Sequence, residues 1–261
     1  MSPPAPSIGA GIGAIYRLQV KRIVRGKRLR LGVVAVVLVL IAILATRYSQ
    51  DLIEVQEVMK RGVALGFFTL LVYLLPFLLN SGAIAEEVEA RTLHYLLARP
   101  VGRLSVTVGK YLAGSSVALG LLIVGLLILH VGVYISEPGL MVEELGTTLR
   151  SAGALTLLTL LYGALCMFWG ALAPEASGVV SALWLGIIEF AFGLLPGVFR
   201  YPSMNYMATE LAGLPKGGIA PDGVPDIEPW VAIAAITTEM LIFLGLAVLT
   251  VGTSEYRFGK A

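Results

Sequence analysis

The sequence predicts an all-α polytopic membrane protein. Of its 261 residues, 57% are hydrophobic and only 14% are charged, whereas soluble domains carry about 25% charged residues. The mean hydropathy is +0.86, and the apolar residues fall in long runs; a helix needs roughly 20 apolar residues to cross a bilayer core. The polar stretches between the runs are too short to bury a core of their own. We therefore expect six transmembrane helices and no soluble domain.

Residues 1–30 are predicted to form a tail followed by an amphipathic helix at the membrane interface. The tail is rich in Pro, Ser, Gly and Ala. From residue 12 onward, apolar and basic side chains occupy opposite faces of a helix: Ile12, Tyr16, Val20 and Ile23 against Arg17, Lys21, Arg25 and Arg28. This pattern is typical of a helix in the headgroup layer, with its cations toward anionic lipid. The alternative is a basic flank that only orients the next helix.

The transmembrane domain is expected to occupy residues 31–252, followed by a short tail at 253–261. The apolar runs place the six spans at about 31–46, 62–83, 111–136, 151–173, 178–199 and 230–252. Pro76 is expected to kink the second span, because proline removes a backbone hydrogen bond. The polar segments between the spans include the loop 84–110 and a proline-rich loop at 200–229.

The distribution of Lys and Arg predicts that both termini are cytoplasmic. Thirteen of the nineteen basic residues fall on the side that holds the termini and the loop 84–110, and six fall on the other side. Because cytoplasmic loops carry the excess of positive charge, we expect a multi-pass protein of the cell membrane, inner or plasma. The net charge of +2 is too small to imply a nucleic-acid partner.

The most informative polar segment is 84–103, which predicts a short amphipathic helix. Three leucines recur at helical spacing, three carboxylates precede them where a helix dipole favours anions, and a proline ends the helix. Such a helix is suited to a groove on a partner protein; the alternative is a solvated loop that its charges keep out of lipid. The residues expected to contact the partner are Glu86, Glu87, Glu89, Arg91, Thr92, Leu93, Leu96, Leu97, Arg99, Pro100 and Arg103.

This segment resembles the signature of the second class of ABC exporter permeases. The shared motif is Glu87-x-Glu89-x-x-Thr92-Leu93, then Leu96-Leu97, Pro100, Arg103 and Gly109-Lys110, and Arg91 stands where the family pattern has glycine. The resemblance implies a cytoplasmic coupling helix that docks on a separate ABC ATPase. It also implies two copies of that ATPase, a homodimer with a second permease copy or a pair with a similar chain, and an outer loop at 200–229 that gates the exit or receives an extracytoplasmic partner.

No motif of catalysis or cofactor binding occurs in the sequence. The stretch from Gly102 to Lys110 ends in Gly-Lys but lacks the spacing of a phosphate-binding loop, and Tyr111 stands where Ser or Thr is needed. His94 and His130 are far apart and have no Cys or carboxylate neighbours in a metal-binding pattern. We therefore expect that the chain is not an enzyme and holds no cofactor, and that ATP and Mg²⁺ bind to the partner ATPase.

Two carboxylates lie within predicted spans, Glu189 in the fifth and Glu239 in the sixth. A charge at the bilayer centre costs at least about 2.5–3.5 kcal/mol, so each should face protein, water or a partner. One interpretation is a polar contact in the transport path or between subunits. The other is a hydrogen bond to a neighbouring helix, for example around Thr237, Thr238 or Ser181. Two further functions stay open: an ion- or proton-coupled carrier that acts alone, and a non-transporting scaffold.

Overall fold

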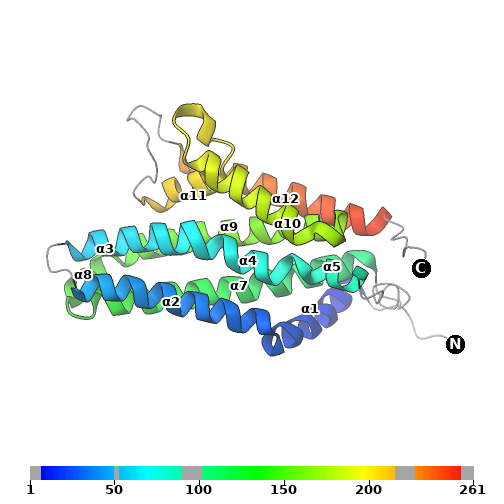
Figure 1. The fold of residues 1–261 in the computed structure, drawn as a ribbon, viewed down its shortest axis with the longest axis horizontal. Coiled ribbons are helices and arrows are strands. Elements are labelled where there is room, and N and C mark those ends of the chain that lie inside the picture. The colour runs from blue at the N-terminus through cyan, green and yellow to red at the C-terminus, as the bar shows by residue number, and fades with distance from the viewer. Residues whose placement is uncertain (1–6, 50–52, 90–101, 215–226, 254–261) are drawn as a thin grey trace.

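The chain folds into a bundle of long helices that run along one common direction (Figure 1). The computed structural model describes residues 7–49, 53–89, 102–214 and 227–253, and these residues form helices and no strands. Within them, five helices are long and apolar enough to cross a membrane: Lys27–Ser49, Val55–Val88, Arg103–Tyr134, Leu145–Leu172 and Pro229–Thr253. The prediction of an all-α membrane protein with several spans is confirmed.

Most of the spanning helices are longer than the apolar runs that predicted them. The first is α2 (Lys27–Ser49), and the second is a run of α3 (Val55–Gly62), the π-helix η1 (Val63–Leu71), α4 (Val72–Asn80) and α5 (Gly82–Glu89). The others are α7 (Arg103–Tyr134), α9 (Leu145–Leu172) and α12 (Pro229–Thr253). The short helices α8 (Pro138–Glu143) and η2 (Pro174–Ala176) flank α9. The second helix continues through Pro76, which lies inside α4.

The predicted fifth span at 178–199 is shorter and less regular than expected. Helix α10 (Ser177–Trp184) continues into the π-helix η3 (Leu185–Ala191), and a turn then leads to the 3-10 helix η4 (Gly197–Arg200). Gly197 has a φ of +67°, a backbone conformation that glycine adopts at no steric cost. This segment is not one of the five long apolar helices, so the described residues do not establish the predicted count of six.

The predicted outer loop at 200–229 contains a helix, α11 (Met204–Ala212), that packs on α9. The hydroxyl of Ser203 caps its first turn by accepting from the backbone N–H of Tyr206, at 3.2 Å. Gly213, with a φ of +67°, ends the helix in the left-handed conformation. Serine before a helix and glycine after it are ordinary boundary signals, so the sequence contained the information for α11.

Helix α9 is the central element of the bundle, and it contacts α4, α7, α10, α11 and α12. Two of its glycines lie where neighbouring helices approach most closely. A Cβ on Gly170 would lie 2.7 Å from the backbone oxygen of Ser81, and one on Gly163 would clash with the hydroxyl of Ser115. Small residues are common at such contacts in membrane bundles, because they let two backbones approach each other.

The N-terminal helix α1 (Ile8–Arg25) meets α2 at a bend at Gly26 and packs its apolar face on α7 (Figure 1). The contact is close: a Cβ on Gly109 would lie 2.9 Å from the Cβ of Ile15 and 3.0 Å from the backbone oxygen of Ile12. The interfacial position predicted for an amphipathic helix within residues 12–30 stays a prediction, and α1 packs apolar side chains on α7. This packing is close because Gly109 gives the backbone of α1 a surface without a side chain.

Replacing Gly109 with alanine is expected to lower the melting temperature and to loosen α1 from α7. Alanine favours a helix over glycine by about 1 kcal/mol, but here its methyl group would push against α1, and overpacking costs about 1–3 kcal/mol. Gly120→Ala on the same helix is the matched control, because no atom lies within 4 Å of a Cβ there. Thermal unfolding in detergent should give Gly109→Ala a free energy of unfolding about 1 kcal/mol or more lower than that of Gly120→Ala. Equal stability would show that α1 does not depend on this contact.

Candidate functional site

The structure describes both ends of the predicted docking segment. Helix α5 carries Glu86 and Glu87, and α7 begins at Arg103. The remaining predicted contact residues lie outside the described part of the chain, as does the side chain of Glu89: Arg91, Thr92, Leu93, Leu96, Leu97, Arg99 and Pro100. The helix expected around these leucines therefore stays a prediction.

A buried ion pair joins the two ends of the segment. Lys110 of α7, only 2% exposed, pairs with Glu87 of α5 and donates a hydrogen bond to the backbone oxygen of Ala83 at 2.7 Å. A buried charge without a partner is costly, because it loses its hydration. Lys110 and Glu87 therefore hold α5, which carries the start of the predicted docking segment at residues 84–103, against α7.

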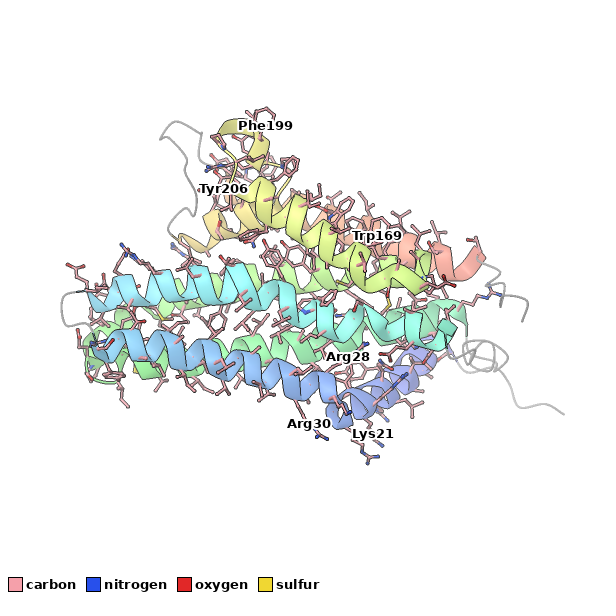
Figure 2. All side chains as sticks on the ribbon, in the orientation of Figure 1. Lys21, Arg28, Arg30, Trp169, Phe199 and Tyr206 are labelled. Carbon is pink, nitrogen blue, oxygen red and sulfur yellow. The ribbon has the colours of Figure 1, made fainter. Side chains whose placement is uncertain are left out.

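A second, more exposed set of ion pairs joins α5 to the N-terminal helices. Glu86 pairs with Arg28 of α2 and with Arg22 of α1, at 3.0 Å for Arg22. Arg22 also reaches Glu87 at 3.4 Å. Exposed pairs of this kind contribute little stability each, but together they connect α1, α2 and α5 at one place. Figure 2 shows Arg28 on the side of α2 that faces this neighbouring helix.

Arg103, the last residue of the predicted contact set, attaches the other end of the segment to α12. Its guanidinium donates to the backbone oxygens of Gly252, at 2.5 Å, and Val251, at 3.3 Å. These carbonyls lie in the last turn of α12, where they lack partners within the helix and where a cation is favoured by the helix dipole. The segment between α5 and α7 thus begins and ends at residues that hold it to α1, α2, α7 and α12.

The structure gives Glu86, Glu87 and Arg103 partners within the chain, which the sequence interpretation had not assigned to them. A signal was present for one pair: Lys110 lies at the start of an apolar run and Glu87 at the end of another, so both needed a buried counter-charge. The docking role of the three residues stays a prediction.

Glu189 lies in a second cluster, deep in the bundle and only 1% exposed. Its Oε2 accepts hydrogen bonds from the hydroxyl of Tyr162, at 2.9 Å, and from the backbone N–H of Asn205, at 3.1 Å. Its backbone oxygen accepts from the hydroxyl of Ser203 at 2.6 Å. The carboxylate therefore joins η3 to α9 and to the start of α11.

Asn205 extends this cluster to the second span. Its side-chain amide donates to the backbone oxygen of Phe68 at 2.7 Å and also contacts the hydroxyl of Tyr73. Phe68 lies in η1, a π-helix, and Glu189 lies in η3, another π-helix. A π-helix leaves backbone carbonyls outside the regular ladder and is frequent at functional sites. Here the side chain of Asn205 donates to a backbone carbonyl of η1.

The Oε2 atom of Glu189 has hydrogen-bond partners other than the three residues suggested by the sequence, whereas its Oε1 is buried without a hydrogen-bond partner among the described residues. Tyr162 and Asn205 take that place instead of Thr237, Thr238 or Ser181. One face of the cluster remains open, because Glu189, Tyr73 and Asn205 also line a small pocket. Glu239 lies on α12 and is half-buried.

Within the described residues, no three His, Cys, Asp or Glu side chains are placed to hold a metal ion. The buried His130 has a structural role: its Nδ1 is 2.8 Å from the hydroxyl of Thr148 and its Nε2 is 3.0 Å from the backbone oxygen of Met141. These contacts join α7 to α8 and α9. Within the described residues, two polar clusters stand out, one around Glu87 and Lys110 and one around Glu189.

Comparison with known proteins identifies the family. A family model described as "ABC-2 family transporter protein" matches residues 14–261, which include about two thirds of α1 and all the long helices. No curated protein matches the chain. The resemblance inferred from the motif at residues 84–110 is therefore confirmed by a match across the whole membrane domain.

Proposed function

Because the chain belongs to the ABC-2 family of transporter proteins, we propose that it is the membrane subunit of an ATP-driven exporter. A permease subunit of this family spans the membrane and is not itself the ATPase. In the proposed complex, two copies of a separate ABC ATPase bind ATP and Mg²⁺. Two copies of this chain pair as a homodimer around the path of the substrate, with both termini on the cytoplasmic side.

The observation that supports coupling is the way in which the docking segment is attached. Its first end is held by the buried pair of Glu87 and Lys110, and its second end by the bonds of Arg103 to the end of α12. A rigid connection is needed if movement of a partner is to tilt the helices. We propose that the ATPase binds residues 84–103 and that ATP-driven closure of the two ATPases shifts the path between inward and outward exposure.

The remaining parts follow from the proposed topology. The segment of α10 and η3 would make the fifth of the six crossings together with the turn that follows it. The outer residues 200–229, which include α11, would gate the exit or contact an extracytoplasmic partner. Glu189 and Glu239 would then lie near the path or near the second copy. Each of these points depends on the exporter proposal.

Replacing Leu96 and Leu97 together with aspartate is expected to reduce co-purification of the ATPase at least about tenfold. Two charges would face an apolar groove on the partner, and an unpaired buried charge is costly. The measurement is the ATPase activity recovered with the tagged chain after purification from its native membranes. Val142→Asp with Leu145→Asp is the matched control, because these exposed apolar residues lie in and beside α8, at the other end of the bundle.

Unchanged recovery of the ATPase in the leucine variant would contradict the proposed docking segment. Transport by the purified chain in vesicles without any ATPase would instead favour the carrier that acts alone. A soluble protein without ATPase activity, captured through the same leucines, would favour the scaffold.

A further inference from the structure

A pocket lies at the bend between α1 and α2, outside the two clusters described above. It has a volume of about 250 Å³. Three cations line it, Arg22, Lys27 and Arg28, together with the amide of Gln19 and a single carboxylate, Glu86. Its remaining lining residues are apolar or glycine and carry no charge. The excess of positive charge predicts an anionic ligand.

The length of α2 places this pocket at the level of the lipid headgroups. Its 23 residues extend for about 34 Å at 1.5 Å per residue, close to the hydrocarbon thickness of about 30 Å. Three basic residues, Lys27, Arg28 and Arg30, lie in its first four positions, and the polar residues Arg47 and Ser49 lie at its other end. The bend at Gly26 is therefore at one surface of the bilayer, where phosphates lie.

The single carboxylate of the pocket does not neutralise all of its cations. Glu86 pairs with Arg22 and with Arg28. Lys27 is exposed and forms no ion pair or hydrogen bond within the described residues. In Figure 2, Lys21 and Arg30 project away from the bundle, whereas Arg28 lies beside the neighbouring helix. Lys27 is thus a pocket cation with a free charge, and Arg30 is a cation of the same helix end outside the pocket.

An exposed apolar stripe begins directly beside Lys27 and follows α2 into the bilayer. Leu31, Val34, Leu38 and Ile41 recur at intervals of three and four residues, and each is 52% to 60% exposed. Lys27 continues the same spacing at the end of the helix, so it lies on the same face. A molecule with an anionic head and an acyl chain would contact the pocket and this stripe at once.

We propose that the bend between α1 and α2 is a binding site for an anionic phospholipid, with the phosphate beside Lys27 and Arg28 and an acyl chain along α2. A free phosphate ion would satisfy the cations but would leave the stripe without a role. The proposal does not depend on the ATPase, because it concerns the chain and the bilayer alone. Since Arg22 and Arg28 also hold Glu86, the bound lipid would lie next to the start of the docking segment.

The test compares two variants that remove one positive charge from the same end of α2. The full-length protein is reconstituted in nanodiscs of phosphatidylcholine with increasing phosphatidylglycerol, and retained lipid is counted by native mass spectrometry after gentle extraction. Lys27→Gln is expected to weaken phosphatidylglycerol retention about five-fold, because a basic residue at an anionic surface contributes about 1 kcal/mol. Arg30→Gln should change phosphatidylglycerol retention by less than about two-fold. The side chain of Arg30 lies outside the pocket, and salt screens its attraction to the anionic lipids. Lys27→Arg should restore retention.

Three results would overturn the proposal. Equal loss in Lys27→Gln and Arg30→Gln would indicate diffuse surface charge without a site. Retention of phosphatidylglycerol no greater than that of phosphatidylcholine would exclude an anionic preference. Full displacement of the lipid by soluble glycerol phosphate would show a phosphate site in which the stripe takes no part. Melting temperatures in pure phosphatidylcholine nanodiscs establish that each variant is folded.

Discussion

Replacing Lys110 with methionine is expected to destabilise the protein by about 4 kcal/mol, the largest effect of any single change proposed here. Methionine fits the space of the aliphatic stem, but Glu87 then keeps a buried charge without its closest partner. Breaking one side of a buried pair costs about 3–5 kcal/mol, mainly because the remaining charge loses its compensation; the half-exposed Arg22, at 3.4 Å from Glu87, replaces only part of it. The backbone oxygen of Ala83 also loses its donor.

The double variant Lys110→Met with Glu87→Leu is the control for this result. Removing both charges replaces the pair with apolar side chains, which is often neutral or stabilising. Thermal unfolding in a fixed detergent should therefore show a large loss in the single variant and recovery of most of it in the double variant. If the single variant has the same melting temperature as the native protein, the pair does not hold α5 to α7. The proposal that movement of the ATPase reaches the membrane helices through this pair then loses its support.

Replacing Glu189 with leucine is expected to cost about 2 kcal/mol. The hydroxyl of Tyr162 and the backbone N–H of Asn205 would both remain buried without their acceptor. Leaving one buried donor unsatisfied costs about 1–3 kcal/mol in general. Side-chain hydrogen bonds in membrane proteins average only about 0.6 kcal/mol each. For two donors we therefore expect a loss between the low value from membrane proteins and the higher general value. Since these bonds hold η3 and α11 together, limited proteolysis should detect loosening of the segment 194–214.

Glu189→Gln separates the structural role of this residue from a role in transport. Glutamine keeps an acceptor oxygen for both donors, so the stability should change by less than about 1 kcal/mol. A change in the substrate-stimulated ATPase activity of the reconstituted complex would then report on the charge itself. Native stability together with native activity in Glu189→Gln would leave Glu189 as a structural residue only, and an equal loss of stability in both variants would contradict the hydrogen-bond argument.

The positions of the long helices could be predicted because they follow from a local property of the chain. A segment such as 111–136 is apolar along its whole length, and its backbone groups must pair within the segment if it lies in lipid. The same reasoning identified the start of α12 at residue 230, one residue from the observed start. It was less accurate at 178–199, where glycine, proline and two kinds of helix interrupt the run.

The partners of the buried polar residues could not be predicted in the same way. Burial implies that Glu189 needs a hydrogen bond, but serine, threonine and tyrosine on any neighbouring helix would serve equally well. The observed partner Tyr162 lies 27 residues earlier, and Asn205 lies in a segment expected to be a loop. A hydrophobic pattern contains no information on which helix faces which.

The sequence by itself determined that this protein is an α-helical membrane protein with a motif that resembles the ABC-2 family, because the hydrophobic runs and the motif are each formed by residues close together in the chain. The tertiary structure decided which charges meet. It placed Lys110 beside Glu87, Arg103 at the end of α12 and the apolar face of α1 on Gly109. Each of these contacts joins residues far apart in the chain, and buried charges and close backbones acquire their partners only when the helices pack.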